Sequence, residues 1–261
     1  MDDPEWRPLG QLLGATLAIT ALQFTTPDGG GGGGGGGRDM LLAASRDRFV
    51  SVYAAPPGTC AGEWGGAAGG WRLVARVKAH DRIIWDAAWA LSVGGGGFRG
   101  GSGGGDSLFA TGGRDKRVKL WTVSGGTSAS FSDASATATG ANETSSVTVS
   151  MSRELPVFGA AVTAVAFALR RWSGARLVLA TGLEDGRILI WAGASPQSWA
   201  AVASVAPNDC HAAAIRAMSW QPQLSWGGGE GGKEDDEACD RMTLASCGGD
   251  HSVRLFGVLM R

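Results

Sequence analysis

Two groups of side chains in this sequence have the composition of a hydrolytic triad. A triad needs a base, a hydroxyl nucleophile and a carboxylate that orients the base. The two groups are His80, Thr111 and Asp115, and His211, Ser246 and Asp250. If either group acted in this way, the histidine would take the proton of the hydroxyl, and the hydroxyl oxygen would attack the substrate.

The regular spacing of the two groups argues against a single active site. In both groups the hydroxyl residue lies four positions before the aspartate, and an aromatic residue lies six positions after it. Side chains of these types form a buried chain of hydrogen bonds from indole through hydroxyl and imidazole to carboxylate, with about 1 kcal/mol net for each bond. We therefore interpret the set as a structural tetrad and expect no enzymatic activity. The complete tetrad is His80, Thr111, Asp115 and Trp121.

The aspartate and its aromatic partner occur four times along the chain. The pairs are Asp47 and Tyr53, Asp115 and Trp121, Asp185 and Trp191, and Asp250 and Phe256. The third and fifth residues after each aspartate are always branched and apolar, and this period of two predicts a β-strand with one buried face. Successive aspartates are 68, 70 and 65 residues apart, so the chain is a repeat protein.

The four copies keep different parts of the tetrad. Copy four ends in Phe256, which has no N–H to donate. Copies one and three have Ala15 and Phe158 at the histidine position. The tetrad positions that remain in these two copies are Asp47, Thr181, Asp185 and Trp191.

Each copy is expected to contain four short antiparallel strands, called a to d. Strand a is expected around 19–24, 83–89, 162–167 and 215–220, and strand b around 41–44, 108–112, 177–182 and 243–247. Strand c follows each aspartate, and strand d is clearest at 71–77 and 199–205. Such a unit is a blade of a WD40 β-propeller, which is an all-β fold. The expected blades are 15–77, 80–155, 158–205 and 211–261, with 6–13 as a strand d of the preceding or closing blade.

Four low-complexity inserts interrupt the repeat pattern. They span 29–37, 94–105, 124–150 and 227–240. Loops tolerate such inserts, because the entropy of loop closure grows only slowly with length. The glycine tract differs from a phosphate-binding loop, since no Lys-Ser or Lys-Thr follows it and no strand-to-helix junction is expected there.

Four blades leave two arrangements open. They either close on themselves, which would be strained, or form an open arc with two exposed blade faces. We expect the open arc, as a fragment of a larger seven-bladed ring that needs the missing blades.

The composition argues against several classes of function. The 261 residues have a formal net charge of −1 and a pI near 6.3, so we expect no direct binding of nucleic acid. No apolar run approaches the length of a membrane span, and no membrane contact is expected. The four cysteines lack CxxC spacing, which favours reduced thiols in a cytosolic or nuclear protein. No metal-ligand cluster or cofactor motif is present, so no cofactor is expected.

A propeller commonly presents loops and strand ends to protein partners. Two positions of each copy are expected near the central channel: the start of strand a, and the residue before the turn aspartate. The candidate partner-binding residues at these positions are Trp85, Arg216, Arg46, Arg114 and Glu184. Trp and Arg side chains commonly anchor interfaces, although Trp85 could equally pack between blades.

Five phrases of the sequence resemble the Elongator second-subunit family. In chain order they are AHDRIIWDAAW, ATGGRDKRVKLW, LPVFGAAVTAVAF, ATGLEDGRILIW and ASCGGDHSVRLF. The resemblance covers all four copies except the glycine-rich inserts, and it corresponds to the C-terminal part of the family's protein. That protein is similar to two joined seven-bladed propellers, so this chain would hold its last four blades.

The resemblance implies a non-catalytic scaffold. The family's protein binds the large scaffold subunit and the catalytic subunit of Elongator, which modifies the wobble uridine of tRNA. This implies protein partners and a location in the cytoplasm, with the nucleus as a second compartment. The alternatives are a WD40 adaptor of another complex, such as a chromatin reader or a ubiquitin-ligase substrate receptor, and a non-functional truncated product.

Overall fold

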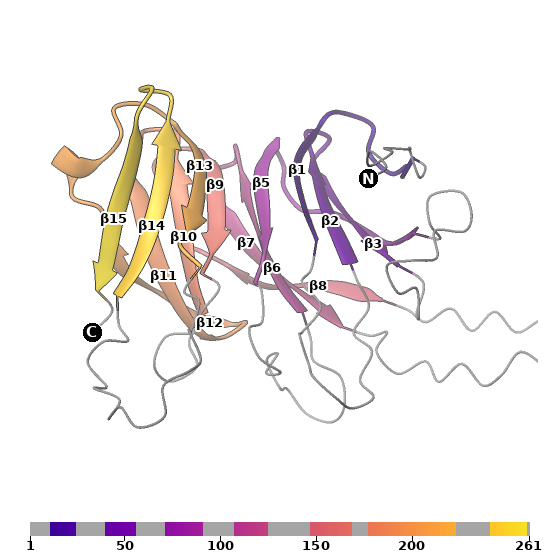
Figure 1. Ribbon diagram of the computed structural model, residues 1–261. Coiled ribbons are helices and arrows are strands. Elements are labelled where there is room, and N and C mark those ends of the chain that lie inside the picture. Colours follow the sequence, from indigo (N-terminus) through magenta and orange to yellow (C-terminus); the bar gives the residue numbers. More distant parts are fainter. Residues whose placement is uncertain are drawn as a thin grey trace, which may run out of the picture.

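The computed structural model is built from antiparallel β-strands (Figure 1). It describes residues 11–24, 40–55, 71–90, 107–124, 147–168, 177–222 and 241–259. These residues form fifteen strands and one short 3-10 helix, η2 (Pro207–Asp209), and contain no α-helix. Apolar and polar side chains alternate along some of the strands, such as Val118–Ser124 and Thr148–Glu154, because successive side chains in a strand point to opposite faces.

The strands form four sheets, and each sheet corresponds to one copy of the sequence repeat. Blade one contains β1 (Ile19–Phe24), β2 (Met40–Ser45), β3 (Phe49–Ala54) and β4 (Arg72–Lys78). Blade two contains β5 (Ile84–Trp89), β6 (Ser107–Gly113), β7 (Val118–Ser124) and β8 (Thr148–Glu154). Blade three contains β9 (Val162–Phe167), β10 (Leu177–Leu183), β11 (Ile188–Ser195) and β12 (Ser198–Ser204). Blade four contains β13 (Ile215–Trp220), β14 (Arg241–Gly248) and β15 (Val253–Leu259).

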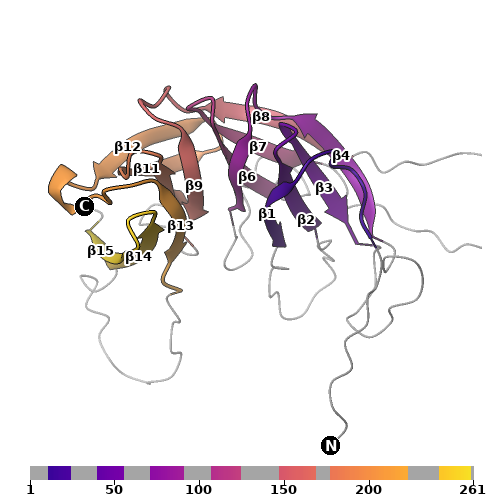
Figure 2. The same ribbon diagram turned by 90° about the horizontal axis from the view of Figure 1, so that it is seen from above.

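The four sheets are arranged as blades of a β-propeller along an arc (Figure 2). In each four-stranded sheet the strands pair in chain order, and the d strands β4, β8 and β12 lie on the convex side of the arc. Blades one and four lie at the two ends of the arc (Figure 2). The predicted all-β propeller fold is confirmed.

The core lies between successive blades and not within one sheet. Three apolar clusters join blade one to two, two to three, and three to four. At the first junction Val50 and Val52 of β3 pack with Trp89 and Trp121 of blade two. The third and fifth residues after each turn aspartate therefore lie on the blade face that packs against the next blade. The opposite face of each blade packs against the preceding blade.

Blade four departs from the predicted pattern. Val253 and Leu255 occupy the positions that are buried in the other three blades, yet they are 73% and 71% exposed. The prediction that this face of the strand is buried is therefore wrong. The physical reason is that a propeller strand buries this face against the following blade, and the described residues contain no blade beyond blade four.

Two expected segments at the edges also differ from the structure. Residues 6–10 of the expected strand 6–13 lie outside the described residues, and 11–13 are not in a strand. Strand β8 begins at Thr148, inside the stretch 124–150 that was expected to be an insert. The other three expected inserts lie entirely outside the described residues.

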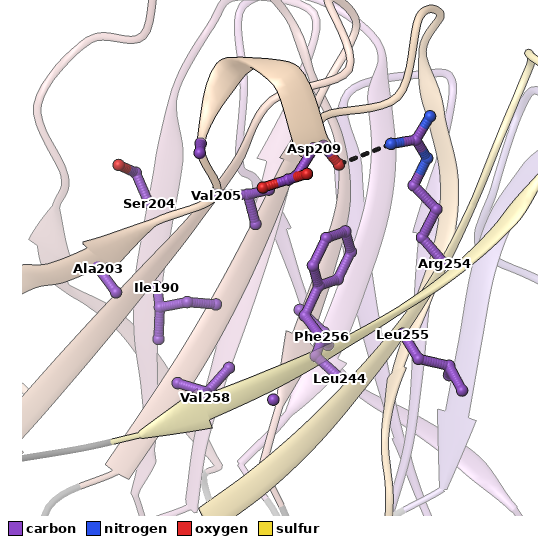
Figure 3. Close-up of a pocket in the computed structure, with 12 residues that line it drawn as sticks. Ile190, Ala203, Ser204, Val205, Asp209, Leu244, Arg254, Leu255, Phe256 and Val258 are labelled. Carbon is purple, nitrogen blue, oxygen red and sulfur yellow. Dashed lines mark hydrogen bonds between the residues drawn. The ribbon is translucent and has the colours of Figure 1, made fainter.

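A pocket of about 620 Å³ lies beside the outer strand of blade four (Figure 3). One wall comes from the end of β12 and the residues after it, including Ala203 and Val205. The other wall comes from β15, including Arg254, Phe256 and Val258. Blade four has three strands among the described residues, so this pocket lies where the other blades carry their fourth strand.

Candidate functional site

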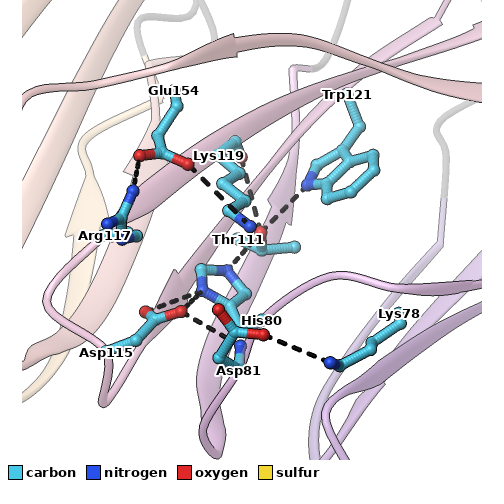
Figure 4. Close-up of polar contacts among 9 residues, drawn as sticks. All are labelled: Lys78, His80, Asp81, Thr111, Asp115, Arg117, Lys119, Trp121 and Glu154. Carbon is cyan, nitrogen blue, oxygen red and sulfur yellow. Dashed lines mark hydrogen bonds and ion pairs between the residues drawn. The ribbon is translucent and has the colours of Figure 1, made fainter.

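The structure brings the four tetrad side chains of blade two together across three segments (Figure 4). The indole Nε1–H of Trp121 donates to the Thr111 hydroxyl at 3.0 Å. His80 lies with Nε2 2.8 Å from that hydroxyl and with Nδ1 2.8 Å from Oδ1 of Asp115. Because a carboxylate only accepts, Nδ1 carries a hydrogen, and the chain runs from indole to hydroxyl to Nε2.

The tetrad is closed to solvent at its centre. Thr111 is 0% exposed and His80 is 1% exposed. Burial alone would raise the pKa of Asp115, but the hydrogen bond from His80 holds it below its usual range. The Thr111 hydroxyl already has an indole and an imidazole as partners, so this geometry does not present it to a substrate carbonyl.

Blade four holds a three-membered version of the same chain. His211 Nε2 lies 2.8 Å from the Ser246 hydroxyl, and His211 Nδ1 lies 2.9 Å from Asp250. The N–H and hydroxyl of Ser252 both donate to Asp250, at 3.2 and 2.9 Å. Burial would raise the pKa of Asp250, yet the bonds from His211 and Ser252 lower it.

Blade one satisfies its turn aspartate without a histidine. The backbone N–H and hydroxyl of Thr16 donate to Asp47 at 2.9 and 3.1 Å, and Arg76 forms an ion pair with it at 3.0 Å. Burial would raise the pKa of Asp47, but the N–H donors of Thr16 and Phe49 lower it. Thr16 and Arg76 therefore supply the bonds that histidine supplies in blades two and four.

In blade three the chain of hydrogen bonds is interrupted and leaves two separate contacts. Trp191 donates to the Thr181 hydroxyl at 3.1 Å, and Phe158 packs against the Trp191 ring at 5.7 Å between centroids. Asp185 is exposed and pairs with Arg187. Burial would raise the pKa of Asp185, but the hydrogen bonds and charge of Arg187 lower it. An aromatic contact thus replaces the imidazole link.

The candidate partner-binding residues lie at equivalent places in the four blades. In each blade the N–H of the residue before the turn aspartate donates to a carbonyl just before strand a. These bonds are Arg46 to Ala18, Arg114 to Ile83, Glu184 to Ala161 and Gly249 to Ala214, all at 2.8–2.9 Å. Arg46, Arg114, Glu184 and Arg216 are exposed. Trp85 is half-buried, and the guanidinium of Arg46 lies 5.5 Å from its ring centroid, so a cation–π contact joins blades one and two.

Sequence reasoning missed Asp86, a half-buried carboxylate on β5. Its Oδ2 accepts from the N–H of Val165 in blade three at 2.9 Å, and its Oδ1 accepts from the N–H of Ala87 at 2.8 Å. Burial raises the pKa of Asp86 to about 6, with those two bonds opposing the rise. The available signal was a lone acid within the aromatic strand RIIWDAAW.

Asp86 makes stability depend on pH in a defined window. Its pKa is higher in the folded chain, about 6, than its ordinary value of 3.8, so the folded state binds the proton more tightly. The free energy of unfolding should therefore fall as pH rises from about 4 to about 6, by at most about 3 kcal/mol. The aspartates with lowered pKa values make the free energy of unfolding rise with pH, but they do so at lower pH than Asp86.

Replacement of Asp86 by Asn should remove that fall. Urea titrations between pH 4 and 7 measure the free energy of unfolding of both proteins. The slope against pH is the diagnostic quantity, because Asn also loses one acceptor and shifts the whole curve. An unchanged slope in the Asp86→Asn variant would contradict the assignment.

The remaining polar groups offer little further chemistry. Within the described residues no cluster of three or more His, Cys, Asp or Glu side chains has the arrangement of a metal site. Cys210 and Cys247 are free thiols, whereas Cys60 and Cys239 lie outside the described residues. No helix in the described part of the chain is long and apolar enough to cross a bilayer.

The fold and the repeated tetrads define a WD40-type β-propeller chain. Seven curated proteins match it, and all are named Elongator complex protein 2. The Danio rerio protein is 29% identical over 97% of this chain and 27% of its own length. The Arabidopsis thaliana protein is 28% identical over 96% of this chain and 24% of its own length. The Dictyostelium discoideum protein is 25% identical over 97% of this chain and 23% of its own length.

The resemblance predicted from the five phrases is therefore confirmed, and it extends along nearly the whole chain. This chain spans about a quarter of the length of the curated relatives it matches. No family model matches it.

Proposed function

We propose that this chain is a non-catalytic scaffold segment of an Elongator complex. In this proposal it supports modification of the wobble uridine of tRNA through protein–protein contacts alone, without itself binding nucleic acid or membrane. Its partners are the large scaffold subunit and the catalytic subunit, and it acts in the cytoplasm, with the nucleus as a second compartment.

The observation that carries the proposal is similarity to Elongator complex protein 2 over 96–97% of the chain in three distant organisms. The tetrads support its non-catalytic part, because the side chains with catalytic composition are buried within blades two and four and used as structural hydrogen bonds. A rigid set of sheets with exposed charged residues at one end suits a docking surface.

The exposed arginines near the start of strand a offer the partner surface in this proposal. Arg114 and Arg216 lie at equivalent ends of blades two and four, and neither forms an ion pair with another described residue. A protein with acidic groups at matching spacing would be steered to them by charge complementarity.

Affinity purification of the tagged chain from its own cells, with mass spectrometry, tests the proposal. The large and catalytic Elongator subunits should co-purify with the chain. The double variant Arg114→Glu and Arg216→Glu should reduce their recovery about tenfold, which corresponds to about 1.4 kcal/mol. The matched control is Arg72→Glu with Arg153→Glu, because these exposed arginines lie on the outer strands β4 and β8.

Different outcomes separate the parts of the proposal. If both double variants recover the subunits equally, the arginine surface is wrong although the scaffold role stands. If a ubiquitin ligase or a chromatin complex is recovered instead of Elongator, the chain is an adaptor of another complex. Recovery of chaperones alone contradicts the scaffold role.

A further inference from the structure

The outer edge of blade three differs from the outer edges of blades one and two. Strands β4, β8 and β12 hold the same place in their sheets, because each pairs with one described strand and lies on the convex side of the arc (Figure 2). Backbone N–H and C=O groups along such an edge are open to pairing with another strand. Blade three lies between blades two and four, so its outer edge is not produced by the first or last residue of the chain.

Charged side chains lie along two of these three edges. They are Arg72, Arg76 and Lys78 in β4, and Arg153 and Glu154 in β8. The third edge strand, β12, has the sequence SWAAVAS and carries no charge. Charges on an edge strand oppose the addition of another strand, because pairing would take them out of water. Among the three, β12 is therefore the edge that a further strand joins at the lowest cost.

The exposure of β12 does not depend on which strands blade four contains. By their pairing with strand c, Ala200 and Ala201 occupy the same positions as two residues in each of blades one and two. Those residues are Arg72, Leu73, Ser150 and Met151. All of them are exposed, although a four-stranded blade follows both blade one and blade two. These two positions therefore face water even where the next blade has its outer strand.

The edge of β12 carries no large side chain that would block a second strand. Trp199, its largest residue, packs on its own sheet, with its ring centroid 6.0 Å from that of Phe167 and its Nε1–H donating to the Pro196 carbonyl at 3.2 Å. A β-bulge at Val202 interrupts the pairing with β11, but β4 and β8 have a bulge at the same position. The bulge therefore does not distinguish the three edges, whereas the charge does.

A second copy of β12 is the strand that this edge suits best. Two copies related by a two-fold axis pair antiparallel, and each presents the same edge to the other. Apart from Trp199, every residue of β12 is Ser, Ala or Val, so no register places like charges opposite each other. The same arrangement of β4 would bring the three cations of one copy against the three of the other.

We propose that two copies of this chain associate through the outer edges of blade three, with β12 of one copy antiparallel to β12 of the other. The pairing joins two four-stranded sheets into one continuous sheet. This inference does not depend on the proposed role in Elongator. The contact is small, so it acts where other contacts already hold two copies together and raise their effective concentration.

Sedimentation equilibrium of the 261-residue chain tests the association. We expect a Kd of about 100 µM, because interfaces of small area are weak. At about 500 µM most of the chain is then paired, and the weight-average mass should rise from 26.6 kDa towards twice that value. At about 10 µM the mass should be close to that of one chain.

Two charge variants test whether β12 pairs with itself. The double variants Ala200→Lys with Ala201→Lys, and Ala200→Glu with Ala201→Glu, each place like charges on both copies. Each should therefore stay monomeric at about 500 µM. An equimolar mixture of the two should regain the dimer mass, because Lys of one copy then lies near Glu of the other. Both positions are exposed, so each variant should keep the circular dichroism spectrum of the wild type.

The matched control places the same charges on the neighbouring outer edge. Ser150→Lys with Met151→Lys changes the equivalent positions of β8, and this variant should retain the dimer mass. A second control, Leu255→Asp, places a charge on the apolar face of blade four, where Leu255 is 71% exposed. It should also retain the dimer mass, because that face is not part of the proposed contact.

Four results would overturn the proposal. The first is a wild-type chain that stays monomeric at about 500 µM. The second is a dimer that persists in both charge variants, and the third is a mixture of those variants that remains monomeric. The fourth is a dimer that Leu255→Asp abolishes, which would assign the contact to the apolar face of blade four and not to β12.

Discussion

Replacement of His80 by alanine should lower the free energy of unfolding by about 3 kcal/mol, as measured by urea titration. The substitution removes two contacts of a side chain that is 1% exposed. It leaves the Thr111 hydroxyl with one partner fewer and takes from Asp115 its main hydrogen-bond donor. A buried polar group that loses its partner costs more than the bond contributed, because water does not replace it.

The same substitution at His211 should cost less, about 1–2 kcal/mol. Asp250 keeps donors from Ser252 and from the backbone of Ala212. The control is His251→Asn, because His251 is exposed and has a φ of 61°, a conformation that Asn tolerates. This control should lie within about 0.5 kcal/mol of wild type. A cost below that level for His80→Ala would contradict the structural role of the tetrad.

Replacement of Gly186 by alanine should destabilise the chain by about 3 kcal/mol or more. Gly186 follows the turn aspartate of blade three and has a φ of 86°. A Cβ at this position would overlap the backbone carbonyl oxygen of His211, the residue at the start of blade four. A backbone atom cannot turn aside as a side chain does, so relief requires blade four to shift on blade three.

The matched control for Gly186→Ala is Lys116→Ala. Lys116 holds the same repeat position in blade two at a φ of 67°, and it already carries a Cβ. Replacement of this exposed residue should therefore change the free energy of unfolding by no more than about 0.5 kcal/mol. Hydrogen exchange distinguishes the two variants further, since only Gly186→Ala should lower protection in β13 to β15. A cost of Gly186→Ala within about 0.5 kcal/mol of wild type would contradict the overlap.

Much of the fold could be predicted because the repeat encodes it locally. The period of two after each aspartate predicts strand c, and the fixed distance to the small residue before it predicts strand b. The predicted first strands match closely, with β9 and β13 at the expected 162–167 and 215–220. Strand β8 was obscured because its TVSMSRE sequence follows a long Ser/Thr-rich stretch.

The polar sites were predictable only in part. The hydroxyl, carboxylate and aromatic positions of a tetrad lie at fixed offsets, and each histidine lies nine positions before the aromatic residue that ends strand a. The contact of His80 with Thr111 and Asp115 could therefore be expected from the repeat. The residues that replace the histidine in blade one could not be expected from spacing, because Thr16 and Arg76 contact Asp47 from two separate segments. The role of Asp86 depends on a donor 79 positions away in the next blade, which no local pattern encodes.

By itself the sequence determined the repeat, the strands, the complete tetrad of blade two and the family resemblance, because each depends on residues at short, regular spacing. The tertiary structure alone decided which blade faces are covered. Val253 and Ile188 occupy the same repeat position, yet one is 73% and the other 0% exposed. Burial of a propeller face depends on whether another blade packs against it, and that is a property of the whole array and not of the strand.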